Sequence, residues 1–154
     1  MTAPTLHLTC HTEADTAAFA AQMADVLAAG DTLLLEGPIG AGKSAFARAL
    51  IRHLAGAEIE VPSPTFTLVQ TYDLPDITVW HCDLYRLTDP EEVLELGLDE
   101  AFTSALCLIE WPDRLGTTAP ANALTLTFAA GSNDHTIKIA PGPAWATRLQ
   151  GLHV

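Results

Sequence analysis

The order of apolar and polar residues along the chain divides it into short β-strands that alternate with helices. Runs of about four to eight residues that are apolar throughout, or that alternate apolar with polar, are typical of strands. Such runs occupy residues 6–9, 31–36, 65–72, 77–83, 105–110, 123–128 and 136–139. Apolar residues at helical spacing predict helices over 13–29 and from 45 to about 54, and a shorter helix that starts at Asp89 and ends at Gly97.

Three of these strands indicate how the sheet is built. Residues 105–110 are apolar on both faces until the final Glu110, which is typical of a central strand in a parallel sheet. Residues 123–128 and 136–139 flank a turn-forming segment, so they predict a C-terminal β-hairpin. We therefore expect an α/β fold with parallel strands at its centre.

Length and composition indicate one globular domain that spans residues 1–154. Hydrophobic residues make up 49% of the chain and charged residues 17%, which fits a compact core. No apolar run approaches the roughly 18 residues of a membrane span, and no signal pattern opens the chain, so we expect a cytoplasmic protein. The scattered Cys10, Cys82 and Cys107 predict reduced, buried thiols, and the six histidines show no metal-ligand spacing.

The formal net charge of −12 limits the partners of this chain. Seven lysines and arginines cannot make a broad footprint on phosphate backbones, so we expect neither strong direct nucleic-acid binding nor binding to anionic membranes. A polyanionic ligand must therefore bind at one local site where positive charge is concentrated. This favours Mg²⁺ as a cation bound together with the ligand.

The segment Gly37-Pro38-Ile39-Gly40-Ala41-Gly42-Lys43-Ser44 fits G-x-x-x-x-G-K-[ST], the phosphate-binding loop, between a predicted strand and a predicted helix. Glycines allow backbone N–H groups to turn toward phosphate, and the helix N-terminus adds its positive dipole end. Lys43 then reaches the β- and γ-phosphates, and the Ser44 hydroxyl is placed to bind Mg²⁺.

Two carboxylates end predicted strands where open α/β sheets place their ligands. Glu110 closes the run 105–110, and with a phosphate loop present it is expected to support Mg²⁺. Asp83 closes the run 77–83. The proline-bracketed hydroxyls of residues 61–67 fit either a switch segment that senses a γ-phosphate or an ordinary loop, and spacing alone leaves both open.

The motif set narrows the class of nucleotide enzyme. A GTPase needs the guanine-reading N-K-x-D, which the chain lacks, and the Asp113-Arg114-Leu115-Gly116 segment is interpreted as a helix or turn fragment. A small-molecule kinase usually needs an arginine-rich lid, whereas the arginines here are dispersed. A minimal ATPase and a nucleotide-gated binding module remain, with a small kinase less favoured.

Several further segments, taken with the phosphate loop, resemble the bacterial TsaE (YjeE) family over roughly residues 12–116. The resemblance rests on the segments Ser63-Pro64-Thr65-Phe66-Thr67-Leu68-Val69, His81-Cys82-Asp83-Leu84-Tyr85-Arg86-Leu87, Asp89-Pro90-Glu91-Glu92, Glu95-Leu96-Gly97 and Leu108-Ile109-Glu110-Trp111-Pro112. It implies a P-loop NTPase-like, three-layer α/β/α fold with a mostly parallel central sheet.

The resemblance also implies a function. Proteins of this family bind ATP and Mg²⁺ and associate with a TsaB–TsaD complex, which transfers threonylcarbamoyl to adenosine 37 of tRNAs that read codons starting with A. ATP hydrolysis, slow in the isolated subunit, supports repeated turnover of that transfer.

The resemblance assigns residues as well. Ser44 and Glu110 become the Mg²⁺ ligands, Lys43 the phosphate-binding lysine, and Asp83 the residue that orients or activates the attacking water; Asp83, Lys43 and Glu110 form the catalytic set. The residues expected to contact the nucleotide are Thr12, Gly37, Pro38, Ile39, Gly40, Ala41, Gly42, Lys43, Ser44, Thr65 and Trp111.

The chain departs from the family pattern at three places. Pro38-Ile39 stands where Asp-Leu is usual, and the proline removes one backbone donor from the loop. Ser44 replaces the usual threonine but keeps the hydroxyl that a metal needs. Cys82 stands where an aromatic residue is common, which we interpret as a packing change.

Overall fold

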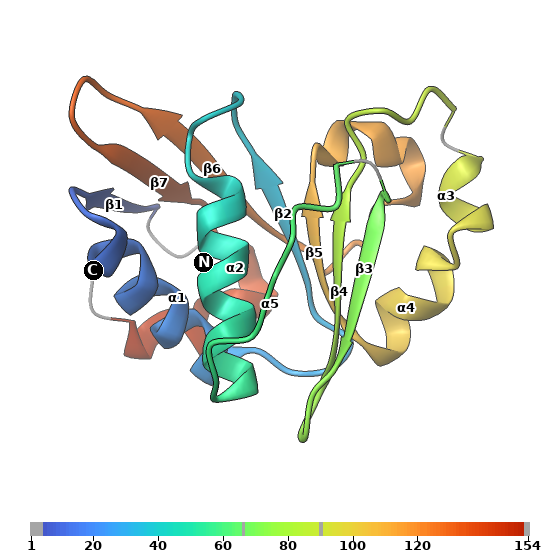
Figure 1. Cartoon of the computed structure of the whole chain (residues 1–154), viewed down its shortest axis with the longest axis horizontal. Coiled ribbons are helices and arrows are strands. Elements are labelled where there is room, and N and C mark those ends of the chain that lie inside the picture. Colours follow the sequence, from blue (N-terminus) through green and yellow to red (C-terminus); the bar gives the residue numbers. More distant parts are fainter. Residues whose placement is uncertain (1–4, 66, 90, 153–154) are drawn as a thin grey trace.

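The computed structural model describes residues 5–152 except 66 and 90, and within them seven strands form one sheet in the order β1-β7-β6-β2-β5-β4-β3 (Figure 1). The strands are β1 Leu6–Cys10, β2 Thr32–Glu36, β3 Val69–Asp73, β4 Thr78–Asp83, β5 Leu106–Glu110, β6 Leu124–Ala130 and β7 His135–Ile139. The four central strands, β6, β2, β5 and β4, run parallel, while β7 and β3 run against them. The predicted mostly parallel sheet and the C-terminal hairpin of β6 and β7 are confirmed.

Helices cover both faces of this sheet. The α-helices are α1 Glu13–Val26, α2 Lys43–Ala55, α3 Glu92–Glu95, α4 Leu98–Ser104 and α5 Pro143–Ala146, and the 3₁₀ helices are Pro112–Thr118 and Arg148–Gly151. In Figure 1, α1 and α2 lie side by side to one side of the sheet, and α3 and α4 lie beyond β3 on the other. Within the described residues, no helix is long and apolar enough to cross a bilayer.

Strand β5 explains why the fold has three layers. Its side chains point alternately to the two faces, and every residue of it is buried. Leu106 and Leu108 join the core beneath α1 and α2, whereas Cys107 and Ile109 join the core beneath α4. Two apolar faces need two covering layers, so the predicted α/β/α arrangement is confirmed.

The first helix is shorter than its sequence pattern predicts. The pattern indicates a helix to residue 29, but α1 ends at Val26 and Leu27 is extended. The Asp31 carboxylate accepts the Ala28 N–H at 2.7 Å, and the Arg148 guanidinium donates to the Val26 carbonyl oxygen. Contacts from outside the helix thus satisfy the backbone groups that would continue it, and these contacts are not visible in local periodicity.

The stretch predicted as a strand over residues 65–72 is also shorter, since β3 starts only at Val69. The Leu68 N–H donates to the Pro64 carbonyl oxygen at 2.7 Å, and Leu68 has a positive φ of 68°. A turn therefore precedes the strand; Phe66, which the prediction included, lies outside the described residues. Helix α4 was not predicted, and Gly97, expected to end a helix, joins α3 to it at a φ of 82°.

Candidate functional site

The candidate site lies where three parallel strands end. Asp83 on β4 and Glu110 on β5 are register partners, and Glu110 is also paired with Leu35 near the end of β2. The loop after β2 is the phosphate-loop motif, which leads directly into α2. Parallel strands bring their carboxyl ends to one edge of a sheet, so these segments meet there. A cavity of about 550 Å³ opens at this edge, lined by Ile39, Gly40, Gly42, Lys43, Ser44, Ala45, Arg48, Thr65, Asp83, Tyr85, Glu110, Trp111 and His135.

The loop conformation requires its glycines. Gly37 has a φ of 140°, and a Cβ there would lie 2.4 Å from the Phe128 carbonyl oxygen. Gly40 and Gly42 have φ values of 83° and 103°, which side chains rarely adopt. A Cβ on Gly40 would meet nothing within 4 Å, so its positive φ, and not a lack of space, is what favours glycine there. Pro38 takes part through its carbonyl oxygen, which accepts the Ala41 N–H at 3.2 Å.

Lys43 is held inside the site and not extended into solvent. Its side chain is almost fully buried, and its Nζ donates to the Gly37 carbonyl oxygen at 2.6 Å. The same Nζ lies 3.7 Å from the centroid of the Trp111 ring. Burial lowers the pKa of Lys43, and the neighbouring Glu110, Asp83 and Asp113 carboxylates oppose this shift. Lys43 is therefore a desolvated cation for which an anionic ligand is a better partner than a carbonyl oxygen.

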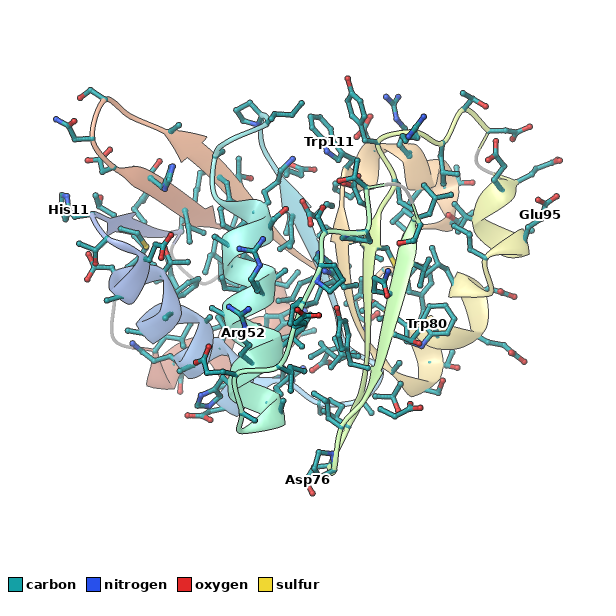
Figure 2. All side chains as sticks on the ribbon, viewed as in Figure 1. His11, Arg52, Asp76, Trp80, Glu95 and Trp111 are labelled. Carbon is teal, nitrogen blue, oxygen red and sulfur yellow. The ribbon has the colours of Figure 1, made fainter. Side chains whose placement is uncertain are left out.

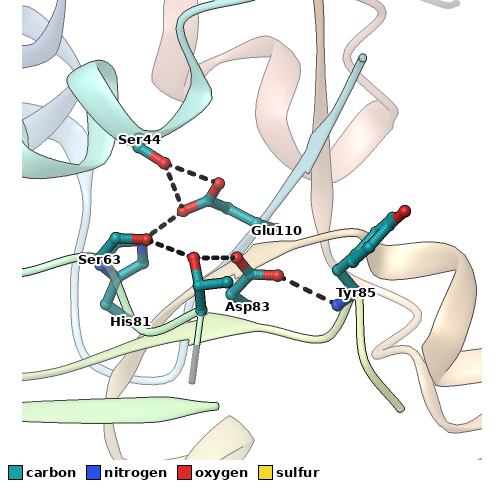
Figure 3. Close-up of polar contacts among 7 residues, drawn as sticks. Ser44, Ser63, His81, Asp83, Tyr85 and Glu110 are labelled. Carbon is teal, nitrogen blue, oxygen red and sulfur yellow. Dashed lines mark hydrogen bonds and ion pairs between the residues drawn. The ribbon is translucent and has the colours of Figure 1, made fainter. Parts of the chain in front are cut away.

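Ser44 and Glu110 meet as the metal hypothesis requires. The Ser44 hydroxyl lies 3.0 and 3.2 Å from the two carboxylate oxygens of Glu110, which brings two oxygen ligands together (Figure 3). The described residues contain no group of three or more His, Cys, Asp and Glu side chains that could hold a metal alone. Mg²⁺ commonly takes one or two protein oxygens and completes its octahedron with phosphate and water, so the pair fits this ion.

Asp83 is fixed beside this pair by the loop that precedes β3. The Thr65 hydroxyl donates to Asp83 Oδ2 at 3.3 Å and shares a hydrogen bond of 2.8 Å with the Ser63 hydroxyl (Figure 3). The Tyr85 N–H donates to the other oxygen, Oδ1, at 3.0 Å. The hydroxyl-bearing loop, which the spacing left open as switch or ordinary loop, is thus linked to a carboxylate of the cavity.

Trp111 lies at the mouth of the cavity in an unusual backbone conformation. Its φ of 60° and ψ of 55° place it in the left-handed region, which a bulky residue adopts rarely. Its ring contacts the Tyr85 ring at a centroid distance of 4.9 Å. Figure 2 shows Trp111 at the same edge of the sheet as the phosphate loop. Such strain at the cavity is consistent with the role in nucleotide contact that the family resemblance implies for this residue.

Four predicted nucleotide-binding residues do not line the cavity: Thr12, Gly37, Pro38 and Ala41. Gly37, Pro38 and Ala41 belong to the phosphate loop itself, in which the Pro38 carbonyl oxygen accepts the Ala41 N–H. Thr12 caps α1 by accepting the Asp15 N–H at 3.1 Å, as its sequence context predicted. Its neighbour Glu13 lines a second cavity of about 570 Å³ between α1 and α2, which shares Ala45 and Arg48 with the first.

The cavity is also lined by four residues that the sequence analysis did not identify: Ala45, Arg48, Tyr85 and His135. Arg48 follows Ser44 by four residues on α2, so helical spacing alone could have placed both on one face. His135 starts β7, and its ring lies 3.6 Å from a Cβ built on Gly42, a neighbourhood that only the folded chain creates. The buried His81, which donates to Glu110, was likewise missed, although it precedes Asp83 by two residues on the same strand face.

Comparison with known proteins identifies relatives of this chain. Residues 10–138 match the family model for the threonylcarbamoyl adenosine biosynthesis protein TsaE. The chain is 46% identical over 103 residues to the tRNA threonylcarbamoyladenosine biosynthesis protein TsaE of Rickettsia bellii, covering 67% of this chain and 72% of that protein. The protein of the same name in Treponema pallidum is 32% identical over 127 residues, covering 80% of this chain and 93% of that protein.

A third relative and a solved structure extend the comparison. The TsaE protein of Bacillus subtilis is 37% identical over 106 residues, covering 68% of this chain and 65% of that protein. The crystal structure of YdiB from Bacillus subtilis superposes with a TM-score of 0.80 at 27% identity, covering 97% of this chain and 95% of that one. The likeness in structure therefore extends over nearly the whole chain.

Proposed function

The chain belongs to the TsaE family of threonylcarbamoyl adenosine biosynthesis proteins, and we propose that it is a Mg²⁺-dependent ATPase of tRNA modification. In this proposal it binds and hydrolyses ATP while associated with a TsaB–TsaD complex. That complex forms threonylcarbamoyladenosine at position 37 of tRNAs that read codons starting with A, and hydrolysis supports its repeated turnover. The proposed place of action is the cytoplasm.

One observation carries the proposal: Lys43, Ser44, Glu110 and Asp83 line a single cavity at the end of a phosphate loop. These are the parts that phosphoryl transfer to water needs, namely a cation for the β- and γ-phosphates, two metal-binding oxygens and a carboxylate.

The chemistry assigns each residue a task. Lys43, already desolvated, exchanges the Gly37 carbonyl oxygen for phosphate oxygens. Ser44 and Glu110 would hold Mg²⁺, which would neutralise charge on the transferred phosphoryl group. Asp83 accepts a hydrogen bond from the attacking water and orients it, while the Thr65 hydroxyl and the Tyr85 N–H fix the carboxylate.

A second candidate is a nucleotide-gated interaction module in which hydrolysis is incidental. It is favoured by two apolar side chains at the mouth of the cavity, since Ile39 is 77% exposed and Tyr85 is 47% exposed. Such residues beside a nucleotide site are suited to contact a partner protein whose docking depends on the nucleotide.

The experiment that separates the two candidates is tRNA modification by the partner complex, followed over many turnovers with and without this chain. ATP is compared with an analogue that cannot be hydrolysed. An ATPase role predicts repeated turnover with ATP only, and Lys43→Ala should abolish it. An interaction module predicts that the analogue supports turnover as well as ATP does.

The acidity of the chain is consistent with a division of labour in which the partner complex, and not this subunit, holds the tRNA. Tight binding of tRNA by the purified chain alone at physiological salt would contradict this part of the proposal.

A further inference from the structure

We propose that His81 is a positioning residue that orients the Glu110 carboxylate for Mg²⁺, an inference that rests on the proposed function. His81 Nε2 lies 2.7 Å from Glu110 Oε2, and both side chains are buried, with exposed fractions of 1% and 3%. The histidine therefore stands behind the carboxylate, within the protein, while the Ser44 hydroxyl approaches the same carboxylate from α2 (Figure 3).

The chemistry of the pair fixes which atom donates. A carboxylate only accepts hydrogen bonds, so Nε2 carries the hydrogen and donates it to Oε2. This bond uses a lone pair of Oε2 and restrains rotation of the carboxylate. Metal-ligating carboxylates are commonly held by such outer partners, and removal of one typically weakens metal affinity about 10- to 100-fold.

The backbone makes this arrangement rigid. His81 lies on β4, whose register with β5 pairs His81 with Leu108 and Asp83 with Glu110. His81 and Asp83 point to the same face of β4, so one strand positions both the histidine behind the metal ligand and the candidate water-orienting carboxylate. A strand holds side chains more precisely than a loop does.

The other ring nitrogen argues against a purely stabilising role. Within the described part of the chain, His81 Nδ1 is buried without a hydrogen-bond partner. Burial of an unpaired polar atom carries a cost, and an apolar residue of similar size would avoid it at this position. The hydrogen bond to Glu110 offsets this cost, because it satisfies a buried carboxylate and holds it in one orientation.

Three variants of His81 and one control test the inference. His81→Leu removes the donor, His81→Asn has an amide too short to reach the Nε2 position, and His81→Gln has one long enough. Val79→Ala, two residues earlier on the same strand face, disturbs the buried core without touching Glu110. The probe is a non-hydrolysable ATP analogue, and its binding is measured by calorimetry over a series of free Mg²⁺ concentrations and in EDTA.

We expect His81→Leu and His81→Asn to raise the Mg²⁺ concentration for half-maximal stimulation of binding about 10- to 100-fold. Affinity in EDTA should stay within about twofold of the wild type, and His81→Gln should restore most of the Mg²⁺ response. Val79→Ala should lower the melting temperature and leave the Mg²⁺ response unchanged. If the leucine variant does not fold, the asparagine and glutamine variants, which differ in reach, decide the question.

The inference is overturned if the asparagine and glutamine variants respond to Mg²⁺ alike, or if loss of His81 lowers affinity equally with Mg²⁺ and in EDTA. Failure of the proposed function has a different signature, because the wild-type chain would then bind the analogue without any dependence on Mg²⁺.

Discussion

The ammonium group of Lys43 rests 3.7 Å from the centroid of the Trp111 ring while it donates a hydrogen bond to the Gly37 carbonyl oxygen. The lysine is thus held by the phosphate loop on one side and by an aromatic face on the other. A triphosphate offers this cation a stronger partner than either, since hydrogen bonds between charged groups are roughly twice as strong as neutral ones. Nucleotide binding should therefore draw Lys43 away from the ring.

This relationship predicts a fluorescence signal. Departure of a cation from the indole face changes its electronic environment, so ATP with Mg²⁺ should change tryptophan emission. Trp80 and Trp145 also emit but do not line the cavity. Trp111→Phe should therefore abolish the change, whereas Trp80→Phe should leave it intact, as a fluorescence titration would show. A nucleotide response that persists in the Trp111 variant would assign the signal to another tryptophan.

Asp83→Asn is expected to lower ATP turnover about 10²- to 10⁴-fold, the range typical for loss of a positioned base. Nucleotide affinity should change only a few-fold, because Asp83 does not supply a cation or a loop amide. Steady-state hydrolysis in the presence of the partner complex and equilibrium binding measure the two effects. Asp76→Asn is the matched control, since this exposed acid lies in the turn between β3 and β4 and outside the cavity lining. Equal losses in both variants would remove Asp83 from the mechanism.

Substitutions of Ser44 separate its hydroxyl from its size. Ser44→Thr keeps the oxygen that lies 3.0 Å from Glu110, so it should retain Mg²⁺-dependent binding and turnover within a few-fold of wild type. Ser44→Ala removes a metal ligand and should raise the Mg²⁺ requirement by about tenfold or more. Hydrolysis measured against free Mg²⁺ distinguishes them, and an unchanged Mg²⁺ requirement in the alanine variant would contradict the assignment.

Arg48 should contribute to nucleotide affinity. Arg48 lines both cavities and is expected to add a charge-assisted hydrogen bond, so Arg48→Ala should weaken ATP binding roughly 10- to 100-fold. Arg52, one turn later on α2, donates to the Ile59 carbonyl oxygen and lines only the second cavity. Arg52→Ala should therefore lower stability without lowering affinity. Calorimetric titration measures the ATP affinity of both variants, and thermal unfolding measures their stability. An equal loss of ATP affinity in the two variants would contradict the role of Arg48.

The three cysteines should be inert in the folded protein. All are free and buried, as the sequence predicted, and burial raises the pKa of Cys107 to about 12 and that of Cys82 well above its ordinary value. Burial also raises the pKa of Cys10, so at pH 8 all three groups are mainly protonated. A colorimetric thiol reagent should therefore react at negligible rate in native buffer and with all three groups in guanidinium chloride. Rapid reaction of one native thiol would indicate an opening of the core.

Features set by residues that are close together in the chain could be predicted from the sequence. The phosphate loop is one contiguous segment, and the chemistry of its glycines, lysine and serine is set by their spacing. The apolar run ending at Glu110 identified a central strand because strand periodicity is local, and its acid fell at the sheet edge because parallel strands share their carboxyl ends. The cap at Thr12 is equally local.

Tertiary structure alone decided which of these residues touch. The register of β4 on β5 brings Asp83 beside Glu110 and lets His81 reach the same carboxylate. Arg148, from the far end of the chain, bonds the last carbonyl of α1 and shortens the helix that periodicity had extended. Periodicity records only which face of its own element a side chain occupies. Partners distant in the chain are chosen by how the elements pack, and that choice determines how Lys43, Trp111, His81 and Glu110 are arranged.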